Sequence, residues 1–321
     1  MPTPSDVTLA DIQAARDRLA GIVVRTPLVR LELPDAAASE IWLKMENLQP
    51  IGSFKIRGAG NAMLIAGRER LAHGAYTASA GNMAQGVAWN ARRLGVPCTV
   101  VVPDHAPQTK VAAIERLGGK TMKVTYERWW QVMEERSYPG IDGVFVHPVS
   151  DAAVIAGNGT IGLEIIEDLP DVDTVLVPFG GGGLSSGIAT AVKGLKPNVN
   201  VFACEVETAP SLSAALAVGH PQKIERKASF IDGIGGMGVL PDMWPIVSAV
   251  LDGALVCSVE EIAQAVKLLA ERARVVAEGA GGSSLAAALK HRVGGKVVCI
   301  VSGGNIDSVK LATILEGKVP A

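Results

Sequence analysis

The chain has 321 residues, 48% of them hydrophobic, which is enough to bury a large core in one domain or two. Its 30 Lys and Arg residues nearly balance its 32 Asp and Glu residues, so charge gives no indication of a nucleic acid or a membrane as partner. Aromatic residues make up only 4%, whereas glycine occurs 36 times, a composition typical of α/β proteins with backbone-lined ligand loops.

The cysteines and the N-terminus indicate the compartment. Cys98, Cys204, Cys257 and Cys299 lie singly in apolar runs, which predicts buried free thiols rather than a disulfide framework or a zinc site. The first residues show no signal-peptide pattern, and the longest apolar runs have the length of strands. We therefore expect a cytoplasmic enzyme.

Hydrophobic periodicity and turn residues predict strands that alternate with helices along most of the chain. A helix over residues 8–21, capped by Thr8, precedes an extended segment at 22–31, a strand at 41–45 and a helix at 58–70. A first series then has strands at 75–78, 98–102, 121–124 and 143–146, with helices at 83–94, 108–117 and 127–136. A second series has strands at 174–177, 200–204 and 296–301, with helices at 151–167, 184–194, 259–274, 281–290 and 307–316.

This alternation predicts an α/β fold with parallel sheets and right-handed crossovers. We expect two open, mostly parallel twisted sheets flanked by helices, with the ligand site in the cleft between two domains. The larger domain is predicted to comprise residues 1–74 and 150–321, and the smaller one residues 75–149. The Gly-rich segment 221–241 has little periodicity, so we expect it to line the site.

Lys55 lies between Phe54 and Ile56, shortly after a turn that contains Pro50 and Gly52. One interpretation is a lysine whose stem covers apolar surface while its ammonium reaches water. The other is a partly desolvated amine with a lowered pKa, able to form a Schiff base with a carbonyl cofactor. This stretch alone does not decide between them.

Ser79-Ala80-Gly81-Asn82 joins a predicted strand to a predicted helix. The loop is either an ordinary helix start or a site where backbone amides bind a carboxylate and Asn82 bonds a phenolic oxygen. Ser302 follows the last predicted strand in the same way. It belongs either to a plain turn or to the edge of a parallel sheet at which ligands bind.

Four consecutive glycines, Gly180 to Gly183, lead from a predicted strand into a predicted helix. Successive glycines let backbone amides converge on an anion, and the helix start adds the positive end of its dipole. A Walker loop would need a lysine that is absent here, and the spacing departs from the dinucleotide pattern, in which Glu205 would bind a ribose. A single phosphate held by amides fits best.

Together these stretches resemble the serine/threonine dehydratase and serine racemase family, the fold-type-II pyridoxal-phosphate enzymes. The resemblance rests on residues 46–58, 79–86, 180–187 and 302–305, four motifs in the family's order, and it covers nearly the whole chain. It implies pyridoxal 5′-phosphate as cofactor, bound by the larger domain, and an amino-acid substrate that contacts the smaller domain. It also implies a homo-oligomer, either a dimer or a tetramer.

The resemblance implies a role for each matched residue. Lys55 would be the catalytic residue and would bind the cofactor covalently, while Asn82 faces its 3′-oxygen and Ser302 its pyridine nitrogen. The other implied cofactor contacts are Phe54, Glu278 and the loop of Gly180, Gly181, Gly182, Gly183 and Leu184, whose amides would hold the phosphate. The implied substrate contacts are Ser79, Ala80, Gly81, Met83 and Arg128.

A neutral hydroxyl such as that of Ser302 cannot stabilise a protonated pyridine as a carboxylate would. The ring is then a weaker electron sink, which disfavours transamination and favours expulsion of a leaving group as the α-proton is removed. Lys55, freed when the substrate takes its place, is the expected base for that proton. Loss of a β-hydroxyl then leads to a 2-oxo acid and ammonia.

Departures from the family pattern bear on the substrate. Met83 stands where histidine is usual, and Ala80 stands where racemases have a serine that can act as the opposite-face base. Trp129-Trp130 follows Arg128, which could bind a carboxylate. A more apolar pocket than one for serine keeps a bulky or aromatic 3-hydroxy amino acid, such as 3-phenylserine, among the expected substrates.

The divalent-metal site of some relatives is matched only in part. Glu205 and Ala209 correspond to its first ligands, but Ser211 stands at the next acidic position. Loss of a carboxylate weakens a site for a hard cation, so metal dependence stays open.

The main prediction is therefore an ammonia-lyase (dehydratase) for a 3-hydroxy amino acid of the serine or threonine type. A β-replacement synthase or an amino-acid racemase of the same fold is the alternative. A nicotinamide oxidoreductase would use the glycine loop and Glu205 but would leave Lys55 unexplained, and a non-catalytic binding protein is the remaining possibility.

Overall fold

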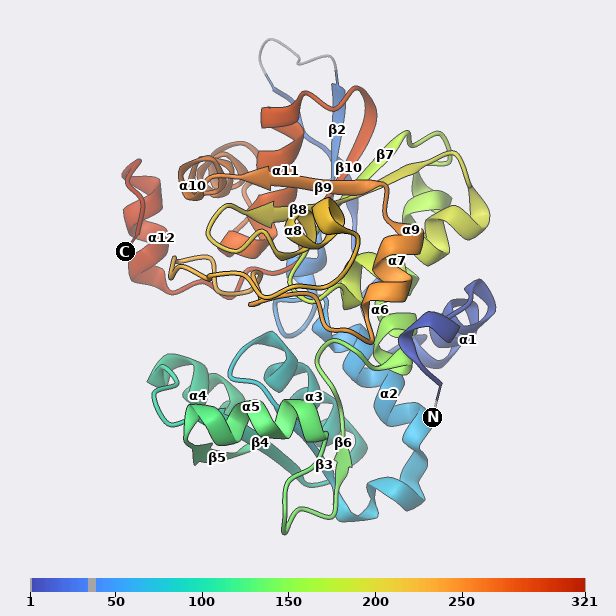
Figure 1. Ribbon diagram of the computed structural model, residues 1–321, viewed down its shortest axis with the longest axis vertical. Helices are drawn as coiled ribbons and strands as arrows, with labels where there is room; N and C mark the ends of the chain where they lie inside the picture. The colour runs from blue at the N-terminus through green and yellow to red at the C-terminus, as the bar shows by residue number, and fades with distance from the viewer. Residues whose placement is uncertain (1, 34–38, 321) are drawn as a thin grey trace.

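The computed structural model describes residues 2–33 and 39–320. In these ranges the strands form two sheets, one of six strands and one of four, with helices on both faces of each (Figure 1). The six-stranded sheet occupies the upper half of Figure 1 and the four-stranded sheet the lower half. The predicted fold class is confirmed.

The six-stranded sheet has the order β1-β2-β10-β7-β8-β9, and all its neighbours are parallel except β1 and β2. Its strands are β1 (Leu28–Arg30), β2 (Ser39–Lys44), β7 (Thr174–Pro178), β8 (Asn200–Val206), β9 (Gly253–Cys257) and β10 (Gly295–Ile300). Alternate side chains of β7 point to opposite faces: Val175 and Val177 enter one core and Leu176 the other. A parallel sheet covered on both faces needs such apolar strands.

Two helix layers cover this sheet. One face packs against α1 (Leu9–Leu19), α6 (Ala152–Asp168), α7 (Gly183–Leu195), α8 (Ser211–Val218) and α9 (Trp244–Val250), the other against α10 (Val259–Leu268), α11 (Gly279–His291) and α12 (Ser308–Leu315). The four cysteines are buried and free, as predicted. No helix in the described ranges is both long enough and apolar enough to cross a bilayer.

The four-stranded sheet is parallel throughout, with the order β5-β4-β3-β6. Its strands are β3 (Ala75–Ala78), β4 (Cys98–Pro103), β5 (Lys120–Val124) and β6 (Val144–Phe145). One core cluster joins it to α2 (Lys55–Arg70), α3 (Asn82–Leu94) and α4 (Gln108–Arg116), and a smaller cluster joins it to α5 (Tyr126–Glu135). Short 3-10 turns lie at Pro4–Asp6, Glu46–Leu48 and Leu71–His73.

All strands of the smaller sheet fall within residues 75–149, and those of the larger sheet fall outside this range. Helix α2, however, contributes Ala59 and Met63 to the core of the smaller sheet, although the predicted division assigns it to the larger domain. Figure 1 shows α2 descending from the region between the sheets along the side of the lower one. The division itself stays a prediction, and we propose that α2 links the two parts.

Several element boundaries differ from the predictions. Helix α2 begins at Lys55 rather than Gly58, and it is interrupted at Gly67, where φ is +74°. The predicted helix 259–274 ends its α-helical part at Leu268 and continues as a π-helical turn, Leu269–Ala273. Helices α8 and α9 and strand β9 were not predicted, and β1 was predicted only as an extended segment.

Candidate active site

Lys55 is the first residue of α2, and its half-buried side chain extends to the segment that follows β6. Its Nζ donates a hydrogen bond to the carbonyl oxygen of Pro148 at 2.6 Å and lies 5.1 Å from the centre of the Phe54 ring. Burial lowers the pKa of the amine to about 8, against the opposing effect of the Glu278 carboxylate. A neutral amine, the nucleophilic form, is therefore accessible near neutral pH.

The loop before Lys55 is held by the segment that follows β10. Phe54 N donates to Ser302 O at 3.0 Å, and Gly304 N donates to Gly52 O at 2.9 Å. Gly52 has φ +69°, and a Cβ there would lie 2.8 Å from Asn305 Oδ1, so only glycine fits. Since β2 and β10 are parallel neighbours, their C-terminal extensions meet, which brings buried Ser302 next to Lys55 in space.

The glycine loop turns β7 into α7. Gly182 has φ +95°, and α7 begins at Gly183, so its first amides have no acceptor within the helix and form an anion-binding end. A Cβ at Gly181 would lie 2.5 Å from Val149 Cγ1, and one at Gly183 would lie 2.7 Å from Val149 O. Pro148 O accepts the hydrogen bond from Lys55, and the next residue, Val149, packs against the glycine loop. Residues 148–149 therefore contact both the amine and the loop. An aldehyde-bearing phosphate fits this arrangement.

The loop between β3 and α3 leads into a helix that packs against the backbone of Lys55. A Cβ at Gly86 of α3 would lie 3.0 Å from the carbonyl oxygen of Lys55, so the two helix starts pack closely. Ser79 Oγ accepts a hydrogen bond from Gly81 N at 3.2 Å, which shapes the turn. Met83 is buried in the core of the four-stranded sheet, and Ala80 packs against that core.

Asn82 joins the smaller sheet to the larger one. Its Nδ2 donates to Glu278 Oε1 at 2.7 Å, and its Oδ1 accepts from Asn305 Nδ2 at 2.8 Å. Burial, with a further contribution from Asp232, raises the pKa of Glu278 to about 7 although Asn82 and nearby lysines oppose the shift. A Cβ at Gly303 would lie 2.5 Å from Glu278 Oε1, so the carboxyl group of Glu278 packs against the backbone of Gly303.

The irregular segment 221–241 reaches the same site through Gly233. A Cβ at Gly180 would lie 3.5 Å from Gly233 O, and a Cβ at Gly233 would lie 3.3 Å from Glu278 Oε1. The neighbouring Asp232 accepts from Lys110 of α4 at 2.5 Å. The segment therefore lies between the glycine loop and Glu278, where the sequence predicted that it would line the site.

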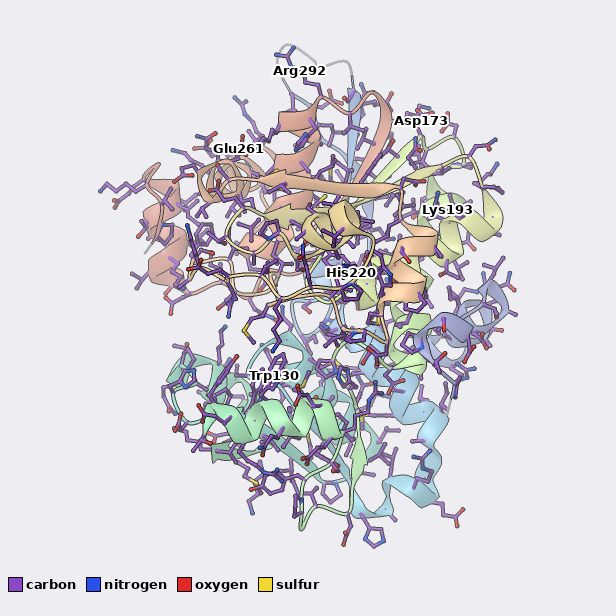
Figure 2. All side chains as sticks on the ribbon, viewed as in Figure 1. Trp130, Asp173, Lys193, His220, Glu261 and Arg292 are labelled. Atoms are coloured by element: carbon purple, nitrogen blue, oxygen red, sulfur yellow. The ribbon has the colours of Figure 1, made fainter. Side chains whose placement is uncertain are left out.

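Arg128 is not brought into contact with these residues. Its guanidinium donates to Gln131 Oε1 at 3.0 Å and lies 5.0 Å from the centre of the Tyr138 ring, both within the part that carries α5. Figure 2 shows Trp130 on the same helix, in the region between the two sheets. Trp130 Nε1 donates to Glu134 Oε1 at 2.7 Å, and its ring lies 6.2 Å from that of Trp129.

Glu205, the acid of the partial metal pattern, is engaged by protein groups. Its carboxylate accepts from Leu212 N at 2.7 Å and from Ser213 N at 2.9 Å, and Ser211 Oγ lies 3.4 Å away. It thereby caps the start of α8, and burial raises its pKa. Buried Ala209 supplies no ligand atom in its side chain. Among the described residues, no three His, Cys, Asp or Glu side chains are grouped to hold a metal ion.

The segment that follows β6 was not predicted as part of the site. His147 is buried, its Nδ1 accepts from Ser150 N at 2.8 Å, and burial, with Arg136 and Lys55, lowers its pKa to about 3. The imidazole therefore stays neutral beside Lys55. The only signal for this segment was its position, since it follows a parallel strand at the edge where ligands bind.

Comparisons with known proteins identify the family. A family described as pyridoxal-phosphate dependent enzyme matches residues 19–303. The L-threonine ammonia-lyase of Thermotoga maritima is 43% identical over 310 residues, which cover 94% of this chain and 76% of that relative. Maize serine racemase has a TM-score of 0.88 and 32% identity over 97% of both chains. Threonine deaminase isoform 2 of Solanum lycopersicum has a TM-score of 0.87 and 32% identity, over 96% of this chain and 86% of that one.

Because the family model covers residues 19–303, the chain is a pyridoxal-phosphate-dependent enzyme. Within that class the chain belongs to the serine/threonine dehydratase and serine racemase family. The predicted cofactor and the predicted enzyme class, an ammonia-lyase of the dehydratase type, are confirmed by these matches. The roles of single residues stay predictions.

Proposed function

We propose that the protein converts a 3-hydroxy amino acid of the serine or threonine type to a 2-oxo acid and ammonia by α,β-elimination. The observation that carries the proposal is the position of the Lys55 amine, which bonds to Pro148 O next to Val149, the residue that packs against the glycine loop. Burial of this amine lowers its pKa to about 8. Relatives named for threonine ammonia-lyase and threonine deaminase activity support the reaction type.

The proposed cofactor site has four points of contact. The amides of the loop from Gly180 to Leu184 would hold the phosphate at the start of α7, and Lys55 would bind the aldehyde carbon. Ser302 would face the pyridine nitrogen, while Asn82, oriented by Asn305, would face the 3′-oxygen. Phe54 and Glu278 would contact the cofactor beside these points.

When bound, pyridoxal phosphate withdraws electrons from Cα of the substrate, which lowers the barrier to loss of the α-proton and of the β-hydroxyl. Lys55 Nζ, released by the substrate amine, would take the α-proton. A base with a pKa near the working pH suits that step, and burial of the amine supplies that property. The amides of residues 79–83 would hold the substrate carboxylate.

Two side chains favour elimination over its alternatives. Ser302, a neutral hydroxyl, would leave the pyridine nitrogen without a counter-charge, which disfavours transamination. Ala80 has no group that could return a proton to the opposite face of Cα, which disfavours racemisation even though maize serine racemase shares the fold. A β-replacement synthase would need a second nucleophile at the same site.

An aromatic 3-hydroxy amino acid such as 3-phenylserine is the second candidate substrate. The observation that supports it is the ring of Trp130 on α5, which lies in the region between the sheets. The neighbouring Trp129 packs against the core of Ala78, Val101 and Val132 instead. Met83, in place of a polar residue, adds no hydrogen-bonding group near the loop.

Release of 2-oxo acid from serine, threonine, 3-hydroxyaspartate and 3-phenylserine, in both enantiomers, tests the proposal. We expect turnover of threonine or serine and a visible absorbance band from covalently bound cofactor that Lys55→Ala removes. A colourless protein that takes up no pyridoxal phosphate would refute it. Running each reaction with and without a chelator tests metal dependence at Glu205, Ala209 and Ser211.

The cytoplasmic location and the homo-oligomeric state, dimer or tetramer, stay predictions. Light scattering coupled to size-exclusion chromatography measures the oligomeric state directly.

A further inference from the structure

Four charged side chains form a cluster beside the first turn of α2, where they are shielded from solvent. Lys44, Glu46 and Arg57 are fully buried and Glu164 nearly so, and we call these four residues the buried charge cluster. Each buried ion loses several kcal/mol of hydration, which only close partners offset. The four residues carry two positive and two negative charges, and the partly exposed Asp168 lies 3.8 Å from Lys44 Nζ at the edge of the cluster.

Arg57 is the centre of the cluster. Its Nε and Nη2 donate to the two oxygens of Glu46 at 2.8 Å each, and its Nη1 and Nη2 donate to those of Glu164 at 2.6 and 3.0 Å. Nη1 also donates to Thr160 Oγ1 at 3.1 Å, and Nη2 to Val24 O at 3.2 Å. All donors of the guanidinium are used, in two bidentate pairs that no lysine can reproduce.

Lys44 completes the cluster from β2. Its Nζ lies 2.7 Å from Glu164 Oε2 and donates to Thr26 O at 2.6 Å. Glu46 Oε1 accepts from Thr26 Oγ1 at 2.6 Å, and Oε2 accepts from Gln49 Nε2 at 3.2 Å. The cluster therefore fastens the end of β2, the beginning of the following loop, the first turn of α2 and the middle of α6 to one another.

The position of the cluster relative to Lys55 suggests its purpose. Glu46 stands at one end of the loop that leads to Lys55, and Arg57 stands two residues after Lys55 on α2. Residues two apart on a helix point about 200° away from each other, so Arg57 faces the cluster while Lys55 faces Pro148. The cluster holds both ends of the segment that carries the amine, without touching the site.

Stability alone does not explain such a cluster, because buried ion pairs often stabilise a fold no better than apolar residues of the same volume. We propose that Arg57 is a positioning residue, which acts with Glu46 and Glu164 to fix the first turn of α2 and thereby the place of the Lys55 amine relative to Pro148 and the glycine loop. The inference rests on the function proposed for Lys55.

Arg57→Lys in the holoenzyme tests the proposal, since it keeps the charge and removes the fork of donors. The matched control is Arg25→Lys, because Arg25 pairs with Glu167 and Asp168 of the same helix α6 but is half exposed. Three readouts are followed: the visible band of the covalently bound cofactor against pH, the rate of cofactor uptake by the apoprotein, and kcat and KM separately.

We expect Arg57→Lys to lower kcat at least about tenfold with KM within about twofold, because a small displacement of the amine affects the chemical step most. The pH midpoint of the band should shift and uptake should slow, whereas Arg25→Lys should match the wild type in all three. A variant with a lower Tm but wild-type band, uptake and kcat would show a purely structural cluster and overturn the proposal.

If Arg57→Lys does not fold, Thr160→Val decides, since it removes one acceptor of Nη1 and leaves the four charges in place. A band shift supports the proposal, and an unchanged band with unchanged kcat overturns it. A wild-type protein without any band refutes the proposed function and this inference with it. A normal band in the wild type, with an unchanged band and unchanged kcat in the variant, refutes the inference alone.

Discussion

Replacing Gly181 by alanine tests whether the glycine loop and Lys55 are coupled through residues 148–149. The new Cβ would lie 2.5 Å from Val149 Cγ1 and 2.8 Å from Cγ2, well inside contact distance. Val149 follows Pro148, whose carbonyl accepts the Lys55 bond at 2.6 Å. The added methyl group must therefore move the loop or the segment that orients the amine.

The substitution should change both the stability of the fold and the affinity for the cofactor. Inserting a methyl group into a packed contact lowers the unfolding free energy by about 1–3 kcal/mol. If Val149 yields, the bond from Lys55 to Pro148 lengthens, and loss of such a bond is worth about 1 kcal/mol. We expect cofactor affinity to fall about tenfold, which corresponds to about 1.4 kcal/mol.

The assay titrates the apoprotein with pyridoxal phosphate and follows the visible band, while urea unfolding measures stability. Gly294→Ala is the control, because a Cβ there meets no atom of residues 2–33 or 39–320 within 4 Å and the residue is exposed. Adding Val149→Ala to Gly181→Ala removes both close atoms and should restore part of the affinity. Wild-type affinity in Gly181→Ala, or no recovery in the double variant, would contradict the coupling.

Three further predictions concern single titratable groups. Because the pKa of Lys55 is lowered to about 8, the neutral amine appears as pH rises through that value, so covalent cofactor uptake should level off above about pH 9; a rate that still rises beyond pH 10 would refute this. The pKa of Glu278 is raised to about 7, so its protonated form stabilises the fold, fully below about pH 4.5 and no longer above about pH 7. In Glu278→Gln the apoprotein should therefore lose about 2–3 kcal/mol less unfolding free energy between pH 5 and pH 8 than the wild type. Glu205→Ala removes the acceptor of Leu212 N and Ser213 N, and urea unfolding should show a loss of about 2 kcal/mol, whereas unchanged stability would exclude the capping role.

The fold was predictable where local patterns and tertiary structure agree. Apolar runs bounded by turns located β3 and β7 closely, since both are buried central strands. Helix α8 was missed because its cap comes from Glu205, seven residues before Leu212, and not from an adjacent polar residue. Helix α2 begins at Lys55, earlier than predicted, because Phe54 N bonds to Ser302 O, a contact that no local pattern records.

The candidate site was predictable where chemistry sits on named side chains at strand ends. Asn82 and Ser302 follow that rule, because the C-terminal ends of parallel strands converge. Lys55 lies eleven residues after β2, and its predicted role came from the resemblance to the family. Pro148 and Val149 were not found, since a backbone carbonyl and an apolar side chain carry no chemical signature. Their importance comes only from what packs against them, the Lys55 amine and the glycine loop.

The buried charge cluster was only partly predictable from the sequence. Lys44 ends an apolar strand, and a charged residue in such a strand predicts either a solvent-facing position or a buried partner. The sequence cannot choose, because Arg57 and Glu164 are 107 positions apart and meet only when α2 packs on α6. With its partners identified, the cluster leads to a specific expectation. Arg57→Lys should change the visible band and kcat, which depend on Lys55 on the opposite side of the helix, and not only the stability of the fold.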